Sequence, residues 1–147
     1  MRIWIALLAT FSVLAAPLAA SAQDAKAKEG AKLLFVTTTG PEDVGMLSSS
    51  FRHAEAAAKS DHTSKVVWLG YGRSVVAFDP SVSVLPGSMK EQIVAAQKAG
   101  VRIVVCAQAL RKWGIDPKTL PEGVEVVANA IDELALLVSD GYEALKY

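Results

Sequence analysis

The chain has 147 residues with fifteen basic and fifteen acidic side chains, so its formal net charge is zero. This balance excludes the strongly basic surface that binds nucleic acid or anionic lipid. The single cysteine excludes a framework of internal disulfides and leaves one thiol without an intramolecular partner.

The first 22 residues are predicted to be an export signal. Arg2 provides a positive charge, residues 3–16 form an almost uninterrupted apolar run, and residues 20–22 (Ala-Ser-Ala) match a cleavage site. The run is shorter than the ~20 residues that span a bilayer, so we expect cleavage before Gln23 rather than a retained anchor. The sequence therefore predicts an exported, periplasmic protein that has no membrane association after cleavage.

The remaining chain is predicted to hold one domain. A polar tether rich in lysine and alanine covers residues 23–31, and residues 32–147 suit a single hydrophobic core. Residues 32–37 form a short apolar run typical of a strand that is buried on both faces. Pro41 then suits the first turn of a helix that should extend to about Lys59. This helix carries one apolar stripe, which consists of Val44, Leu47, Phe51, Ala54 and Ala58.

The middle of the domain predicts a second strand and a second helix. The strand covers residues 65–69 and ends in a glycine-rich turn. Residues 75–78 fit either a strand or a short helix, and residues 79–87 are predicted to be a loop. Ser88 begins a capping box, and the helix that it starts should end at Gly100.

A third buried strand, residues 101–105, delivers Cys106 to its carboxyl end. Residues 107–113 follow as a short helix. Cys106 therefore lies where the backbone NH groups of a helix start can stabilise a thiolate. This placement makes the thiol the candidate catalytic group.

The last part of the chain predicts a fourth strand at residues 124–127 and a final helix capped by Asn129. Its apolar residues on one face are Ile131, Leu134, Val138 and Leu145. Strands thus alternate with helices throughout. The alternation predicts a single compact three-layer α/β domain, with a mostly parallel sheet and helices on both faces.

Ligands of such sheets bind at the carboxyl ends of the strands. Several residues that follow predicted strands could share a cleft with Cys106, and Arg73 among them is the candidate cation for its thiolate. The expected neighbours of Cys106 in this cleft are Thr38, Gly40, Tyr71, Arg73 and Trp113.

Hydrolysis by a cysteine nucleophile needs a base, usually histidine. The only histidines, His53 and His62, are predicted to be solvated surface residues, so a Cys–His hydrolase is not expected. They also form no metal-ligand spacing with Cys106, and we predict no metal and no cofactor. The alternative for Cys106 is a packed, inert side chain that behaves as a small hydrophobe.

The segment around Cys106 resembles the DsrE/DsrF-like sulfur-relay proteins, which have the YchN-like fold. In that family a helix ending in an AxxAG pattern precedes a strand, a cysteine, a short helix and a glycine. Residues 95–100 match the lead-in, residues 101–110 and Gly114 match the centre, and residues 120–127 match a later L-x-x-G-V-x-V-V pattern. The chain departs from many members at Tyr71, where they have a histidine.

The resemblance implies a compact α/β fold that assembles into homotrimers or homohexamers. It also implies that Cys106 accepts sulfane sulfur as a persulfide and passes it to a partner thiol, on a protein or a small molecule. One cysteine suffices for such transfer, since the partner supplies the second thiol. The donor, the acceptor and the pathway are not indicated.

Three hypotheses follow from the sequence. The first is an exported sulfur carrier or sulfurtransferase that uses Cys106. The second is a non-catalytic homo-oligomer that binds a small ligand or a protein and has a packed cysteine. The third is a thiol that forms a mixed or intersubunit disulfide. Whether the chain is an enzyme therefore stays open at this point.

Overall fold

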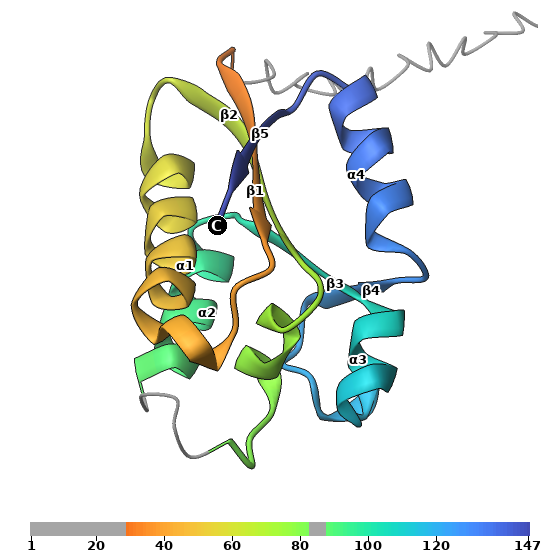
Figure 1. Ribbon diagram of the computed structural model, residues 1–147. Helices are drawn as coiled ribbons and strands as arrows, with labels where there is room; N and C mark the ends of the chain where they lie inside the picture. Colours follow the sequence, from red (N-terminus) through yellow and green to blue (C-terminus); the bar gives the residue numbers. More distant parts are fainter. Residues whose placement is uncertain (1–28, 83–87) are drawn as a thin grey trace, which may run out of the picture.

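The computed structural model describes residues 29–82 and 88–147 (Figure 1). The predicted export signal, most of the predicted tether and residues 83–87 of the predicted loop lie outside these residues. The described chain forms one α/β domain around a central sheet, as the sequence predicts.

The sheet has five parallel strands in the order β4-β3-β2-β1-β5. The strands are β1 (Ala31–Thr37), β2 (Thr63–Gly70), β3 (Arg102–Cys106), β4 (Val124–Val127) and β5 (Glu143–Lys146). The three central strands are buried over most of their length, and the two edge strands are largely exposed. Apolar runs in the sequence therefore mark the centre of the sheet.

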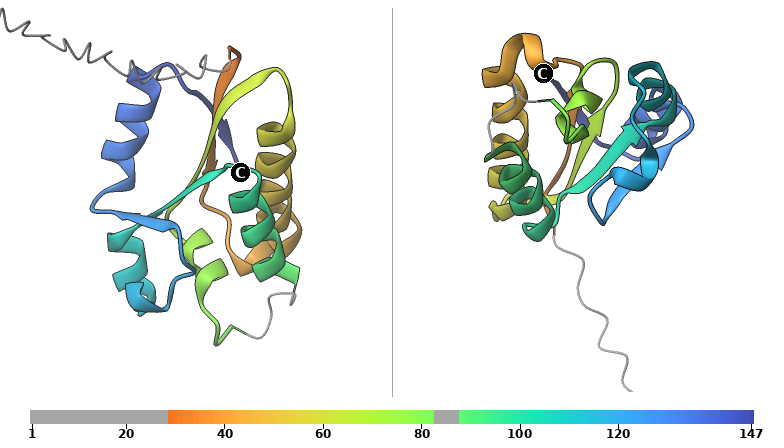
Figure 2. Two further views of the ribbon diagram at one scale, coloured as in Figure 1. Left: turned by 180° about the vertical axis from the view of Figure 1, so that it is seen from behind. Right: turned by 90° about the horizontal axis from the view of Figure 1, so that it is seen from below.

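Helices cover both faces of the sheet (Figures 1 and 2). α1 (Val44–Lys59) and α2 (Ser88–Lys98) lie on one face, whereas α3 (Ala107–Trp113) and α4 (Ala130–Ser139) lie on the other side. Within the described part of the chain, three short 3-10 helices connect these elements, namely η1 (Pro41–Asp43), η2 (Ser74–Phe78) and η3 (Pro117–Thr119).

The apolar stripe of α1 packs against the sheet as predicted. Leu47, Phe51 and Ala54 are fully buried, and the Phe51 ring stacks on Trp68 of β2 with 4.3 Å between ring centroids. The Trp68 indole NH donates a hydrogen bond to the Ser50 hydroxyl at 2.9 Å, so the buried polar atom of this side chain is satisfied. These contacts fix α1 on one face of the sheet.

The ambiguous segment at residues 75–78 is a buried 3-10 helix, η2. The Ser74 hydroxyl group donates to the Thr37 carbonyl at 2.7 Å, which holds η2 against the carboxyl end of β1. Phe78 packs edge-on against Trp68 and Phe51, at centroid distances of 5.8 and 6.1 Å. The short helix thus completes the core on the α1 side.

The predicted extent of the last helix is wrong. α4 ends at Ser139, and Leu145 belongs to the edge strand β5, which pairs with β1. Gly141 adopts a φ of +85°, a left-handed conformation that favours glycine and ends the helix. The predicted apolar face is correct only at Leu134, which packs against the core. Ile131 and Val138 are exposed, and Ala130 and Leu137 are the buried residues of the helix.

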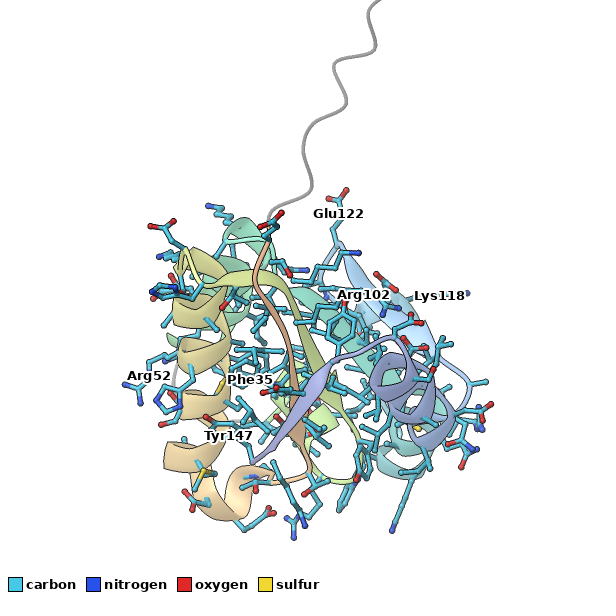
Figure 3. The ribbon with its side chains drawn as sticks, turned by 90° about the horizontal axis from the view of Figure 1, so that it is seen from above. Phe35, Arg52, Arg102, Lys118, Glu122 and Tyr147 are labelled. Carbon is cyan, nitrogen blue, oxygen red and sulfur yellow. The ribbon has the colours of Figure 1, made fainter. Side chains whose placement is uncertain are left out.

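Arg102 ties α4 to the sheet from the start of β3. Its guanidinium group forms ion pairs with Glu125 of β4 and Glu133 of α4, each at 2.7 Å. Figure 3 shows Arg102 between these two elements. The two carboxylates raise the pKa of Arg102, so the guanidinium stays charged.

The chain ends beside β1. Tyr147 packs its ring against Phe35 with 5.7 Å between centroids (Figure 3), and its backbone NH donates to the Val36 carbonyl. Of the helices in the described residues, none has both the length and the apolar character needed to cross a membrane.

Candidate functional site

Cys106 is the last residue of β3 and the residue immediately before α3. It pairs with Val127 of the edge strand β4. The residue is 6% exposed, so its thiol lies just beneath the surface at the carboxyl end of the sheet.

The alternation of side chains along β3 decides which way Cys106 points. Trp68 faces α1 and pairs with Ile103 in the parallel register, so Ile103 and Val105 face the same side. Val104 and Cys106 therefore project to the opposite face, where α3 and α4 lie.

Tyr71 comes directly after the last residue of the neighbouring strand, β2. Gly70, the last residue of β2, pairs with Val105, which places Tyr71 in the row of Cys106. The Tyr71 side chain is half-buried against the core cluster that includes Cys106. Its backbone NH donates to the Thr37 carbonyl at 3.1 Å, so the ladder extends past the end of β2.

Residues 71–73 form a segment that we call the β2 loop, and α3 holds this loop in place. The Trp113 indole NH donates to the Gly72 carbonyl at 2.9 Å. The Arg73 guanidinium group lies over the Trp113 ring at 5.3 Å from its centroid, a cation–π contact. Trp113, the last residue of α3, therefore contacts the loop directly, whereas Cys106, immediately before α3, lies in the row of Tyr71.

Arg73 also contacts the start of η1. Its Nε atom lies 3.1 Å from Glu42 Oε2, and Glu42 Oε1 accepts a hydrogen bond from the Gly40 backbone NH. A Cβ atom on Gly40 would lie 2.6 Å from the Arg73 Cβ, so only glycine permits this close approach. The Gly40 NH is the main cause that lowers the pKa of Glu42, and Arg73 contributes less.

The structure thus brings together the residues that the sequence placed at one edge of the sheet. Thr38 lies beside Gly72, since its carbonyl oxygen would be 3.7 Å from a Cβ added there. Among the described residues, the Arg73 guanidinium group contacts Glu42 and the Trp113 ring rather than the Cys106 thiol. Within the described residues, no side-chain hydrogen bond or ion pair joins the Cys106 thiol to the cluster of Thr38, Gly40, Tyr71, Arg73 and Trp113.

Glu42 contacts two residues of this cluster, Gly40 and Arg73, and sequence reasoning missed it. In the sequence it only follows Pro41 in the predicted first turn of a helix. Its ion pair with Arg73 joins two loops that are far apart in the chain, and no local pattern reports such a contact.

The two histidines lie away from Cys106. His53 is exposed on α1, on the other face of the sheet, and its Nδ1 atom is 2.8 Å from the Tyr147 hydroxyl. His62 is exposed before β2. Within residues 29–82 and 88–147, no three histidine, cysteine, aspartate or glutamate side chains gather as they would around a metal ion.

Solved structures with this fold include three bacterial or archaeal proteins. The ychN protein from E. coli superposes with a TM-score of 0.64 and 19% identity, over 80% of this chain and 99% of that one. The MTH1491 protein of unknown function from Methanobacterium thermoautotrophicum superposes with a TM-score of 0.61 and 21% identity, over 81% of this chain and 100% of that one. The BT1422 protein of unknown function from Bacteroides thetaiotaomicron superposes with a TM-score of 0.61 and 19% identity, over 79% of this chain and 94% of that one.

These identities are low, so the structural similarity establishes the fold alone. A search of the curated proteins found no match. The model of the DsrE/DsrF-like family matches residues 31–147, which include every strand and helix of the described domain. The chain therefore belongs to the DsrE/DsrF-like family.

Proposed function

We propose that this protein is an exported sulfur carrier that holds a persulfide on Cys106. The observation that carries the proposal is the position of the only cysteine, at the carboxyl end of the central sheet and next to the β2 loop. Family membership supports the same role. The lone thiol suits transfer between molecules, since the chain has no second cysteine for an internal disulfide.

The transfer requires a donor with a sulfane sulfur, such as glutathione persulfide. The Cys106 thiol gives its proton to solvent, and its sulfur attacks the outer sulfur of the donor. A new S–S bond forms on Cys106, the S–S bond of the donor breaks, and the donor leaves as a thiolate. A thiolate of the acceptor then attacks the outer sulfur on Cys106 and releases the cysteine thiolate.

Burial of Cys106 has two consequences for this chemistry. It limits overoxidation of a thiol that has no resolving cysteine. It also requires the neighbouring segments to move before a donor can reach the sulfur. The β2 loop suits this movement, because the Trp113, Arg73 and Glu42 side chains that hold it are all exposed.

The proposal includes export and self-association. Export rests on the signal pattern of residues 1–22, and N-terminal sequencing of the secreted protein should find Gln23 first. Retention of Met1 would contradict cleavage. Self-association is supported by the exposed apolar side chains of α4, namely Ile131, Leu136 and Val138. The family resemblance implies that the assembly is a homotrimer or homohexamer.

The direct test is intact-mass measurement after incubation with glutathione persulfide. The wild-type protein should gain the mass of one sulfur atom, and dithiothreitol should remove it. Cys106→Ala should gain nothing, and Trp113→Phe should still gain the sulfur atom. A wild-type spectrum without a sulfur adduct, under conditions in which the same donor converts free cysteine to its persulfide, would overturn the proposal.

The 6% exposure of Cys106 favours one competing function, a binding module in which the cysteine only packs. Labelling of the native protein with iodoacetamide separates the two. A sulfur carrier should label completely in the folded state, at a rate below that of glutathione. A packed cysteine should label only at the rate of global unfolding.

A further inference from the structure

A cavity of about 400 Å³ lies between η2, the start of α2 and the segment that follows η3. Most of its wall is apolar and includes Phe78, Val82, Met89, Ile93 and Pro121. Its volume falls within the roughly 300–1,000 Å³ that small-molecule sites occupy.

The cavity is separate from the Cys106 site. Phe78 packs against Phe51 and Trp68, so this wall belongs to the α1 and α2 side of the sheet. Cys106 projects to the opposite face. Neither Cys106 nor the β2 loop lines the cavity.

The polar side chains in the wall are not equivalent. Asp79 Oδ1 already accepts two hydrogen bonds from Ser81, one from its backbone NH at 2.8 Å and one from its hydroxyl at 2.6 Å. The Thr119 hydroxyl donates to the Asp116 carbonyl at 2.8 Å. The Lys90 ammonium group has no carboxylate partner or hydrogen-bond acceptor among the described residues. Lys90 is therefore the polar group of the wall that has donors to offer.

We infer that this cavity binds a small molecule with an apolar body and one carboxylate group. The apolar body lies against Phe78, Met89 and Ile93, and the carboxylate accepts hydrogen bonds from Lys90. Few polar groups in an apolar wall are the usual arrangement in ligand sites, where they orient the bound molecule. The inference goes beyond sulfur transfer, because it uses no atom of the Cys106 site.

Octanoate and octanol are suitable probes, since they share a chain and differ in the head group. In titrations of the full chain by NMR, octanoate should bind saturably and shift the methyl signals of Met89 and Ile93. The methyl signal of Ile131, which lies on the outer side of α4, should stay in place. Absence of saturable octanoate binding, or equal shifts at Ile131, would overturn the inference.

A pair of variants on α2 tests the head-group assignment. Lys90→Gln should weaken octanoate binding about threefold to fivefold, as expected for a pair at an exposed lysine, and should leave octanol binding unchanged. Lys98→Gln removes the same charge at the other end of the helix and should change neither. Equal effects of the two variants, or tighter binding of octylamine than of octanoate, would overturn the role of Lys90.

Two further variants separate this site from the proposed sulfur chemistry. Ile93→Phe narrows the cavity and should weaken octanoate and octanol together, with folding checked by circular dichroism. Cys106→Ala should bind both probes as the wild type does. Loss of octanoate binding in Cys106→Ala would overturn the independence of the cavity.

Discussion

The Thr37 hydroxyl group is buried at the carboxyl end of β1 and has no hydrogen-bond partner among the described residues. Thr37→Val replaces it with a methyl group of similar shape and leaves the backbone carbonyl free to accept from Ser74 and Tyr71. We expect the free energy of unfolding to rise by about 1 kcal/mol, because an unsatisfied buried hydroxyl is removed. Urea denaturation measures the change. A lower stability of the variant would mean that the hydroxyl has a partner in solution.

The lowered pKa of Glu42 predicts that the free energy of unfolding depends on pH. Its pKa is lowered below the ordinary value of 4.5, first by the hydrogen bond from the Gly40 NH and to a smaller extent by Arg73. A carboxylate with a lowered pKa in the folded state stabilises the protein above pH 4.5, and this stabilisation is lost as the pH falls through the folded-state pKa. An NMR titration should therefore place the Glu42 midpoint below 4.5.

The matched variants are Glu42→Gln and Glu143→Gln, the second at an exposed carboxylate of β5. Stability should fall less steeply below pH 4.5 in Glu42→Gln than in the wild type, and Glu143→Gln should follow the wild type. A Glu42 midpoint at or above 4.5 would contradict the interactions seen around this side chain.

Among the elements, the β2 loop and α3 are the segments that we expect to control access to Cys106. Trp113→Phe removes the hydrogen bond to Gly72 and keeps an aromatic ring beside Arg73. Since a hydrogen bond contributes roughly 1 kcal/mol net, we expect iodoacetamide to label Cys106 about fivefold faster. Lys112→Gln, a change at the neighbouring exposed residue, should label at the wild-type rate. Equal rates in all three proteins would show that the β2 loop does not control access.

The sequence predicts an element best when its signal is local. The stripe of α1 and the Asn129 cap, whose side chain accepts from the Ile131 NH, are both confirmed. β5 gave no such signal, because its four residues are exposed and lack an apolar run. Its pairing with β1 joins the two ends of the described chain, and apolar periodicity alone extended the helix to Leu145 instead.

The same limit applies to the candidate site. Parallel strands end at one edge of the sheet, which was enough to predict that Thr38, Gly40 and Arg73 lie close together. The contact between Arg73 and Glu42 and the face to which Cys106 points depend on the tertiary arrangement. They could not be predicted from neighbouring residues.

At the scale of the whole molecule, the outer side of α4 predicts self-association. Ile131 and Leu136 are each 56% exposed and Val138 is 49% exposed, which is unusual for a helix that faces only water. Light scattering after size-exclusion chromatography should give a trimer or hexamer, and Ile131→Lys should reduce the mass to that of one chain. Ser139→Lys adds the same charge at the end of α4 and should keep the assembly. A monomeric wild-type protein would contradict this prediction.

The order of the strands has a consequence for folding. β4 and β5 are the two edges of the sheet, and α4 alone connects them across its face. The pairs β1–β2 and β2–β3 join segments that are closer in sequence, so their loops close at a smaller entropic cost. We therefore expect β5 to dock last during folding and to open first in the native state. Its amide protons should exchange with solvent before those of the three central strands.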